Sequence, residues 1–142
     1  MIRRRRPIAR TSRPRRVRKG SRAALKRKCD RLWSQLIRAS NGGRCKLAGK
    51  DHVRCGGPIQ AAHLFGRGHH SVRHELWNGW PLCAGHHVYY TNQPERWQAL
   101  LRDALSEAAH IGYAIRFMQA QAIGKPDYSA IAAELEKELK TA

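Results

Sequence analysis

The chain has 142 residues, 42% of them hydrophobic, and a formal net charge of +18 from 28 lysines and arginines against 10 acidic residues. This length corresponds to one modest domain, and a core of that size favours additional stabilisation by a bound metal ion. The charge is larger than an enzyme acting on neutral small molecules needs, and it indicates a polyanionic partner such as nucleic acid. An anionic membrane surface is the competing partner. The basic segment lacks an apolar face, however, and no apolar run is long enough for a transmembrane helix.

The N-terminal segment carries much of this charge. Residues 1–28 hold half of the lysines and arginines and no acidic residue. Because the segment is poor in apolar residues and repels itself, we expect residues 1–20 to form a disordered basic arm. Such an arm would neutralise nucleic-acid phosphates in a salt-dependent manner that ignores sequence. A solubilising tail is the simpler alternative. The arginines assigned to nucleic-acid binding are Arg3, Arg4, Arg5 and Arg6.

A helix is predicted to follow, over about residues 21–39. Apolar residues recur there at helical spacing, and Ser-Asn-Gly-Gly at 40–43 supplies a stop signal. Cys29 belongs to this apolar stripe, so we interpret it as a core residue rather than a metal ligand. Residues 44–58 are predicted to form a loop.

Two short apolar stretches come next, at 59–65 and 76–82, with a polar, histidine-rich connection between them. Glycine and proline interrupt the region, so two strands joined by a loop fit it better than one helix. Three further helices are predicted. One spans about 84–93, one begins at Pro94 and continues to about residue 112, and one covers about 128–140.

The cysteines are interleaved with histidines, a pattern that in a reducing cytosol favours metal binding over disulfides. A disulfide framework is the alternative. Cys83 and His86 form a Cys-x-x-His pair at the expected start of a helix, where the turn brings both side chains to one point. With Cys45 and Cys55 they make a Cys3His set suited to a structural Zn²⁺. The gap between these two cysteines exceeds the usual spacing of about two to four residues. His52 therefore remains a replacement for one of them.

A second group of residues is not explained by that zinc site. His63 falls in the first predicted strand, Asn78 in the second, and His87 on the following helix. Ala-Ala-His at 61–63 and Asn-Gly-Trp-Pro-Leu-Cys-Ala-Gly-His-His at 78–87 resemble the HNH endonuclease family, in particular its phage-encoded branch. That family has Asn followed by Leu-Cys-x-x-Cys-His. The resemblance covers about residues 44–97.

This resemblance implies an α+β fold, with a small zinc-stabilised ββα-metal core, flanking helices and the disordered N-terminal arm. Residues 21–142 would form a single HNH-type domain, with its core at about 44–97 and C-terminal helices at about 95–140. The implied activity is metal-dependent hydrolysis of DNA phosphodiester bonds, by nicking or by double-strand cleavage. The products would carry 5′-phosphate and 3′-hydroxyl ends.

The resemblance also implies a role for each site residue. His63 would act as the general base, a contribution worth roughly 100- to 10,000-fold in rate. His87 would ligate the catalytic divalent ion, which would be Mg²⁺, Mn²⁺ or another divalent ion. Asn78 would hold the loop so that His63 is aimed, or would itself touch the metal. Arg67 and Arg73 flank the histidine-rich loop and are assigned to bidentate contacts with the scissile phosphate, against the alternative of generic charged surface.

The chain departs from the family pattern at two positions. The family usually has Asp or His immediately before the base, whereas this chain has Ala62, which cannot coordinate a metal. His86 replaces the second cysteine of the motif, and an exchange of roles between His86 and His87 stays open. Candidates for the missing ligand are His69, His70, His74 and Glu75.

We therefore expect a DNA endonuclease that takes part in phage DNA processing, with packaging or recombination proteins as further partners. No apolar stretch follows the arginine-rich start, so no signal peptide is expected and the bacterial host cytoplasm is the expected location. The main alternative is a non-catalytic zinc-binding nucleic-acid module, which Ala62 favours. An RNA-binding or ribosome-associated basic protein is a more distant alternative.

Overall fold

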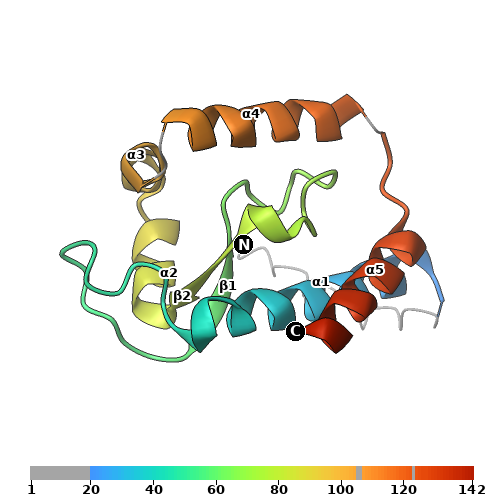
Figure 1. Ribbon diagram of the computed structural model, residues 1–142, viewed down its shortest axis with the longest axis horizontal. Helices are drawn as coiled ribbons and strands as arrows, with labels where there is room; N and C mark the ends of the chain where they lie inside the picture. Colours follow the sequence, from blue (N-terminus) through green and yellow to red (C-terminus); the bar gives the residue numbers. More distant parts are fainter. Residues whose placement is uncertain (1–19, 105–106, 123) are drawn as a thin grey trace, which may run out of the picture.

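The computed structural model describes residues 20–104, 107–122 and 124–142. In these residues the chain forms five α-helices and one two-stranded sheet, which confirms the predicted α+β class (Figure 1). The expected disordered arm, with its four clustered arginines, falls on residues 1–19 and lies outside the described residues. The elements are α1 (Arg22–Ala39), β1 (Ile59–His63), β2 (Gly79–Cys83), α2 (Ala84–Thr91), α3 (Pro94–Ala104), α4 (Glu107–Ala122) and α5 (Tyr128–Thr141).

Most predicted elements lie where the sequence patterns placed them. The helices predicted over 21–39, 84–93 and 128–140 correspond to α1, α2 and α5. The stop signal after α1 forms a 3₁₀ turn in which Asn41 has a φ of 57°, a left-handed conformation that asparagine tolerates. Residues 59–63 and 79–83 form the predicted hairpin strands.

The single helix predicted over 94–112 is wrong, because the structure has two helices there, α3 and α4, that run in different directions (Figure 1). Each helix packs its aromatic residues on a different target. Trp97 of α3 joins the core beside Trp80, whereas Phe117 of α4 stacks on Phe65 of the loop between the strands, with ring centroids 4.6 Å apart. One straight helix cannot satisfy both contacts.

Asn78 also differs from expectation, because it precedes β2 rather than lying within it. It is the last residue of a short 3₁₀ helix, Leu76–Asn78, and its backbone N–H donates to the Glu75 carbonyl at 3.0 Å. This turn reverses the chain just before the second strand begins.

The two strands pair antiparallel from Ile59 opposite Cys83 to His63 opposite Gly79. Helix α1 packs on one face of this hairpin and α5 packs against α1, while α2 packs on the other face and α3 against α2. Because side chains alternate along a strand, the sheet supplies side chains to both layers.

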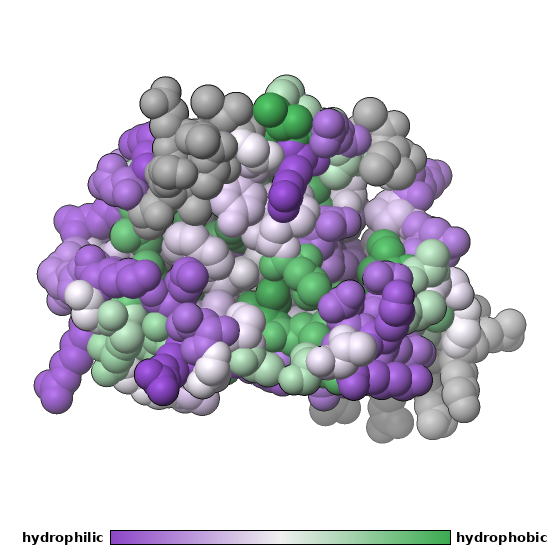
Figure 2. Space-filling model, viewed as in Figure 1, coloured by the Kyte–Doolittle hydropathy of each residue, from purple (hydrophilic) through white to green (hydrophobic). Residues whose placement is uncertain are grey.

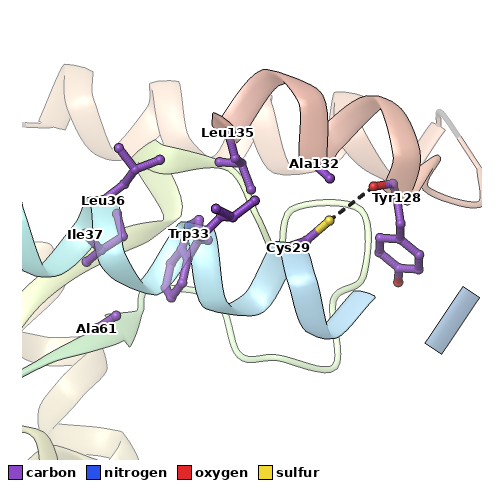
Figure 3. Close-up of a cluster of buried hydrophobic side chains, with 9 residues drawn as sticks. Cys29, Trp33, Leu36, Ile37, Ala61, Tyr128, Ala132 and Leu135 are labelled. Carbon is purple, nitrogen blue, oxygen red and sulfur yellow. Dashed lines mark hydrogen bonds between the residues drawn. The ribbon is translucent and has the colours of Figure 1, made fainter. Parts of the chain in front are cut away.

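The first core cluster lies between α1, α5 and one face of the sheet (Figure 3). Cys29 is fully buried in it, and its thiol donates to the Tyr128 carbonyl at 3.2 Å. Burial raises the pKa of this thiol. The interpretation of Cys29 as a core residue is therefore confirmed. The cluster contains Cys29, Leu32, Trp33, Leu36, Ile37, Ala61, Tyr128, Ala132 and Leu135.

The second core cluster lies on the opposite face of the sheet and joins the 44–58 loop to the sheet, α2 and α3. It contains Cys45, Leu47, Ala62, Leu64, Trp80, Leu82, Cys83, Tyr90 and Leu101.

On the molecular surface shown in Figure 2, hydrophilic side chains surround a smaller apolar area. None of the helices in the described part of the chain is long and apolar enough to cross a membrane.

Gly79 marks the closest approach of α1 to the hairpin. A Cβ atom at this position would lie 2.6 Å from Cδ1 of Ile37 and 2.6 Å from Cζ2 of Trp33. We predict that Gly79→Ala lowers the free energy of unfolding by about 1–3 kcal/mol, the usual cost of overpacking a core. Chemical denaturation of the metal-loaded protein measures this change. Gly112→Ala is the control, because its Cβ would meet nothing within 4 Å and alanine favours the helix. Equal stability of the two variants would contradict the prediction.

Candidate metal centre and catalytic pocket

Cys45, Cys55, Cys83 and His86 come together at one point, with all four ligand atoms within 4.8 Å of one another. The Nδ1 atom of His86 lies 3.0 Å from the sulfur of Cys83 and 3.6 Å from the sulfurs of Cys45 and Cys55. Zinc bonds of about 2.3 Å to sulfur and about 2.0–2.1 Å to nitrogen, at the tetrahedral angle, place N and S about 3.6 Å apart. The four residues are thus close enough to hold a metal ion such as zinc.

Local backbone contacts bring the ligands together. Cys83 ends β2 and caps α2, so His86 falls in the first turn of that helix. Two backbone hydrogen bonds, each 2.9 Å long, hold the 44–58 loop beside this turn. The N–H of Ala84 donates to the Pro58 carbonyl, and the N–H of Gly85 donates to the Gly56 carbonyl. The cluster therefore joins the loop, the second strand and α2.

The sulfurs of Cys83 and Cys55 differ in proton affinity. Burial opposes ionisation of Cys83, but hydrogen bonds from the backbone and side chain of His86 lower the pKa of this thiol to about 6. Burial and the neighbouring sulfurs of Cys83 and Cys45 raise the pKa of Cys55 to about 11. Thiolates this close repel one another, so all three ionise together only around a cation. This is the donor chemistry of a structural zinc site.

Asp51 supports the cluster from outside and was missed in the sequence. Its Oδ1 lies 2.9 Å from Nε2 of His86, and the Tyr90 hydroxyl donates to Oδ2 at 2.6 Å. Burial would raise the pKa of Asp51, but the hydrogen bonds from Tyr90 and His86 lower it below its usual value. The carboxylate therefore fixes the proton on Nε2 and leaves Nδ1 to face the sulfurs. The sequence feature that could have indicated this role is that Asp51 is the only acidic residue between Cys45 and Cys55.

Two alternatives for the ligand set can now be compared with the geometry. His52 does not replace a cysteine, because its Nε2 contacts the Tyr89 hydroxyl at 3.0 Å and it is absent from the cluster. His86 rather than His87 faces the sulfurs.

We predict that Asp51→Asn weakens zinc affinity about 10- to 100-fold, the usual effect of removing such an outer hydrogen bond. The substitution removes the carboxylate charge opposite His86 and leaves one acceptor oxygen for two donors, His86 and Tyr90. Competition with a chromophoric chelator measures the affinity. Asp103→Asn, an exposed position on α3, is the control for charge and should bind zinc like the unaltered chain. An Asp51 variant with unaltered affinity would show that the carboxylate does not orient His86.

His63 and His87 line a shared cavity of about 240 Å³ at the end of β1. The two imidazoles belong to opposite faces of the hairpin. His63 stacks on Trp33 of α1, with ring centroids 4.0 Å apart, whereas His87 on α2 contacts the Gln60 side chain. They meet only at this end of the strand, where Ala62 also forms part of the wall.

The tautomer of His63 follows from its hydrogen bond. Nε2 lies 2.9 Å from the Arg73 carbonyl oxygen, which can only accept, so Nε2 carries the proton and Nδ1 carries the lone pair. Burial, together with the smaller effect of the positive charge of Arg67, lowers the pKa of His63 to about 4, despite the opposing effect of this hydrogen bond. His63 is therefore a neutral imidazole with a free acceptor at pH 7.

Asn78 holds the loop that begins after His63. Its side chain is fully buried, its Oδ1 accepts from the Phe65 N–H at 2.7 Å, and its Nδ2 donates to the carbonyls of Phe65 and Val72 at 3.2 and 2.9 Å. These bonds close the loop between residues 65 and 72. Because these bonds use both its oxygen and its nitrogen, the Asn78 side chain holds the loop and is not placed to bind a metal.

The guanidinium of Arg73 is buried and paired with a carboxylate, so it is not free to bind a phosphate. It is 8% exposed, and its Nε and Nη2 donate to the two carboxylate oxygens of Asp30 at 2.7 and 3.0 Å. His74 contacts the same carboxylate at 2.7 Å. Burial would raise the pKa of Asp30, but hydrogen bonds from Arg73 and His74 lower it to about 2. The expected phosphate contact by Arg73 is therefore replaced by an ion pair to α1, which also fixes the carbonyl that holds His63.

Arg67 remains available for an anion. Its side chain is exposed, and among the described residues only its backbone carbonyl is hydrogen-bonded, as the acceptor for Nη1 of Arg73 at 2.8 Å. Burial lowers the pKa of His87, and so does the charge of Arg67, as it does for His63. The positive charge of Arg67 thus acts on both imidazoles of the cavity.

Gln60 holds the ring of His87 from the neighbouring strand. It lies on the same face of the sheet as Ala62, and its Oε1 lies 2.6 Å from Nδ1 of His87. Because an amide oxygen accepts, Nδ1 of His87 carries the proton and its Nε2 carries the lone pair. No sequence pattern predicted this contact.

The four candidates for a substitute ligand do not lie in this cavity. His74 is held by Asp30, and His69, His70 and Glu75 are exposed. Among the described residues, the Cys3His cluster is the only group of three or more histidine, cysteine or acidic side chains placed to hold an ion. Any catalytic ion at Nε2 of His87 would therefore take most of its ligands from water and substrate.

Comparison with protein-family models, with curated proteins and with solved structures finds no significant match to this chain.

We predict that His63 stays neutral across the physiological range. In the zinc-loaded protein, the His63 ring signals in a ¹H–¹³C NMR titration should not move between pH 8 and pH 5, because its pKa is about 4. The same ring in the denatured chain should titrate near the unperturbed value of about 6.5. Since the folded pKa is the lower one, His63 contributes stability that is complete above about pH 6.5 and is lost as the pH falls toward 4. A folded-state midpoint near 6.5 would contradict this account.

Proposed function

We propose that this protein is a metal-dependent endonuclease of the HNH type that hydrolyses DNA phosphodiester bonds. Cys45, Cys55, Cys83 and His86 would form its structural zinc site. The observation that carries the proposal is the state of His63, a neutral imidazole whose protonated nitrogen is held by a backbone carbonyl and whose cavity also contains His87. This is the arrangement a general base requires.

The residues of the cavity support a hydrolytic step. Nδ1 of His63 would accept a proton from water, the water oxygen would form a bond to phosphorus, and the bond from phosphorus to the 3′ oxygen would break. The leaving oxygen would take a proton from solvent, which gives 3′-hydroxyl and 5′-phosphate ends. A divalent ion bound at His87 would supply charge stabilisation for the phosphorane and the leaving oxygen. Arg67, close to both histidines, would bind the phosphate.

The low pKa of His63 makes it a weak base, so the proton transfer from water needs further assistance. A base with a pKa of about 4 is fully deprotonated at pH 7 but has a weak driving force for proton transfer. Two effects compensate for this weakness. The attacking water becomes more acidic near a divalent cation, and a bound phosphate offsets the charge of Arg67.

A non-catalytic zinc-binding nucleic-acid module is the second candidate. It is favoured by Ala62 and by the lack, among the described residues, of a second group of three metal-binding side chains. The net charge of +18 serves this function equally well. The two candidates differ only in turnover.

The experiment is nicking of supercoiled plasmid with added Mg²⁺ or Mn²⁺. We predict that the unaltered chain nicks the plasmid and that His63→Ala reduces the rate by about 100-fold or more, the contribution of a general base. His52→Ala is the matched control, an exposed histidine outside the cavity, and should retain the full rate. All three proteins are first compared for zinc content, thermal unfolding and DNA binding.

The outcomes separate the two candidates. Equal nicking by the His63 variant and the unaltered chain would remove His63 as the base. Tight DNA binding with no nicking by any of the proteins, under either metal, would leave the non-catalytic module as the function.

A further inference from the structure

A second cavity, of about 720 Å³, lies apart from the metal centre and the catalytic pocket. It is formed where the first turn of α1, residues 68–71 of the loop between the strands, and residues 124–126 before α5 come together. Figure 1 shows these segments on the side of the molecule away from α2 and α3. No residue of this cavity has a role in the site described above.

The cavity is strongly cationic. Arg22, Lys26 and Lys125 line it together with two histidines, and no acidic residue is among the described residues that line it. The positive charge of Lys26 is the largest cause of the lowered pKa of His70. These charges therefore act on a shared space, where an anion would be stabilised.

Two uncharged features also favour an anion here. The Oγ atom of Ser71, a residue of the cavity wall, is buried and has no hydrogen-bond partner among the described residues. The cavity also includes the N-terminal turn of α1, where backbone N–H groups and the helix dipole favour negative charge. The guanidinium of Arg22 is held over the Tyr128 ring, 4.6 Å from its centroid, so this cation is positioned in advance.

We propose that this cavity binds a backbone phosphate of the nucleic acid, at a second contact separate from the scissile phosphate. The inference rests on the proposed function, which supplies the nucleic acid as ligand. One loop connects the two contacts, because Leu64 and Gly66 line the catalytic pocket while residues 68–71 line the second cavity. A phosphate held at the second cavity fixes this loop relative to the strand that enters the pocket of His63.

The test compares two double variants with the same loss of charge in the full-length, zinc-loaded chain. Lys26→Gln with Lys125→Gln removes two cations of the cavity, and Lys137→Gln with Lys140→Gln removes two exposed cations of the last turns of α5. Binding to a fluorescent DNA duplex is measured by anisotropy over a range of NaCl concentrations. Each phosphate contact adds about 0.9 to the slope of log affinity against log salt.

We expect the cavity variant to lose about 0.9 in slope, the value of one phosphate contact, and about tenfold in affinity near 0.1 M salt, while the control variant keeps both values. Equal slopes for the two double variants would overturn the inference, as would a failure of the unaltered chain to bind the duplex.

Lysine footprinting on the unaltered chain provides a readout that does not depend on how the variants fold. Bound DNA should protect Lys26 and Lys125 from acylation more than Lys137 and Lys140, as measured by mass spectrometry. Equal protection of all four lysines would contradict the inference. Absence of nicking with selective protection intact would overturn the endonuclease and retain the cavity as a nucleic-acid contact.

Discussion

The convergence of three cysteines and one histidine is the constraint on which the rest of the structure depends. The 44–58 loop contributes only Cys45 and Leu47 to the buried core, so apolar burial alone holds it weakly. Metal binding to such sets provides about 10–16 kcal/mol in isolated zinc-finger peptides, a large amount for a core of this size. The same cluster sets the first turn of α2. His87 follows His86 in this first turn, so its position depends on the cluster as well as on its own contact with Gln60.

A second constraint, from α1, positions the other histidine. Asp30 binds the guanidinium of Arg73 through both carboxylate oxygens, and the carbonyl of Arg73 accepts from Nε2 of His63. Trp33, one helical turn after Asp30, stacks on the His63 ring from the same helix. Two elements far apart in sequence thus approach the end of β1 from opposite faces, α1 holding His63 and α2 holding His87. The cavity between them is a consequence of both contacts and of the small side chain at Ala62.

The features predictable from sequence are those that depend on neighbours along the chain. Helical spacing predicted α1, α2 and α5, and the Cys-x-x-His spacing of Cys83 and His86 placed two ligands together, because one turn of helix determines both. Asp51, Asp30 and Gln60 could not be found in this way, since each acts through a partner between 27 and 44 residues away. Arg73 was misinterpreted for the same reason, because its counter-ion, Asp30, lies 43 residues away on α1. The junction between α3 and α4 was missed because apolar spacing is continuous through a change of direction.

The electrostatics of the chain link binding to chemistry under the proposed function. Burial lowers the pKa of His63 and His87, and the nearby positive charge of Arg67 adds to this effect. The cavity between them therefore presents two neutral nitrogen acceptors. Under the proposed function, a phosphate bound beside Arg67 would offset that charge and would raise the pKa of His63 by the part that this cation contributes, while burial, the larger cause, would remain. The base would become stronger when substrate is present, so the positive charge would contribute to proton transfer as well as to affinity.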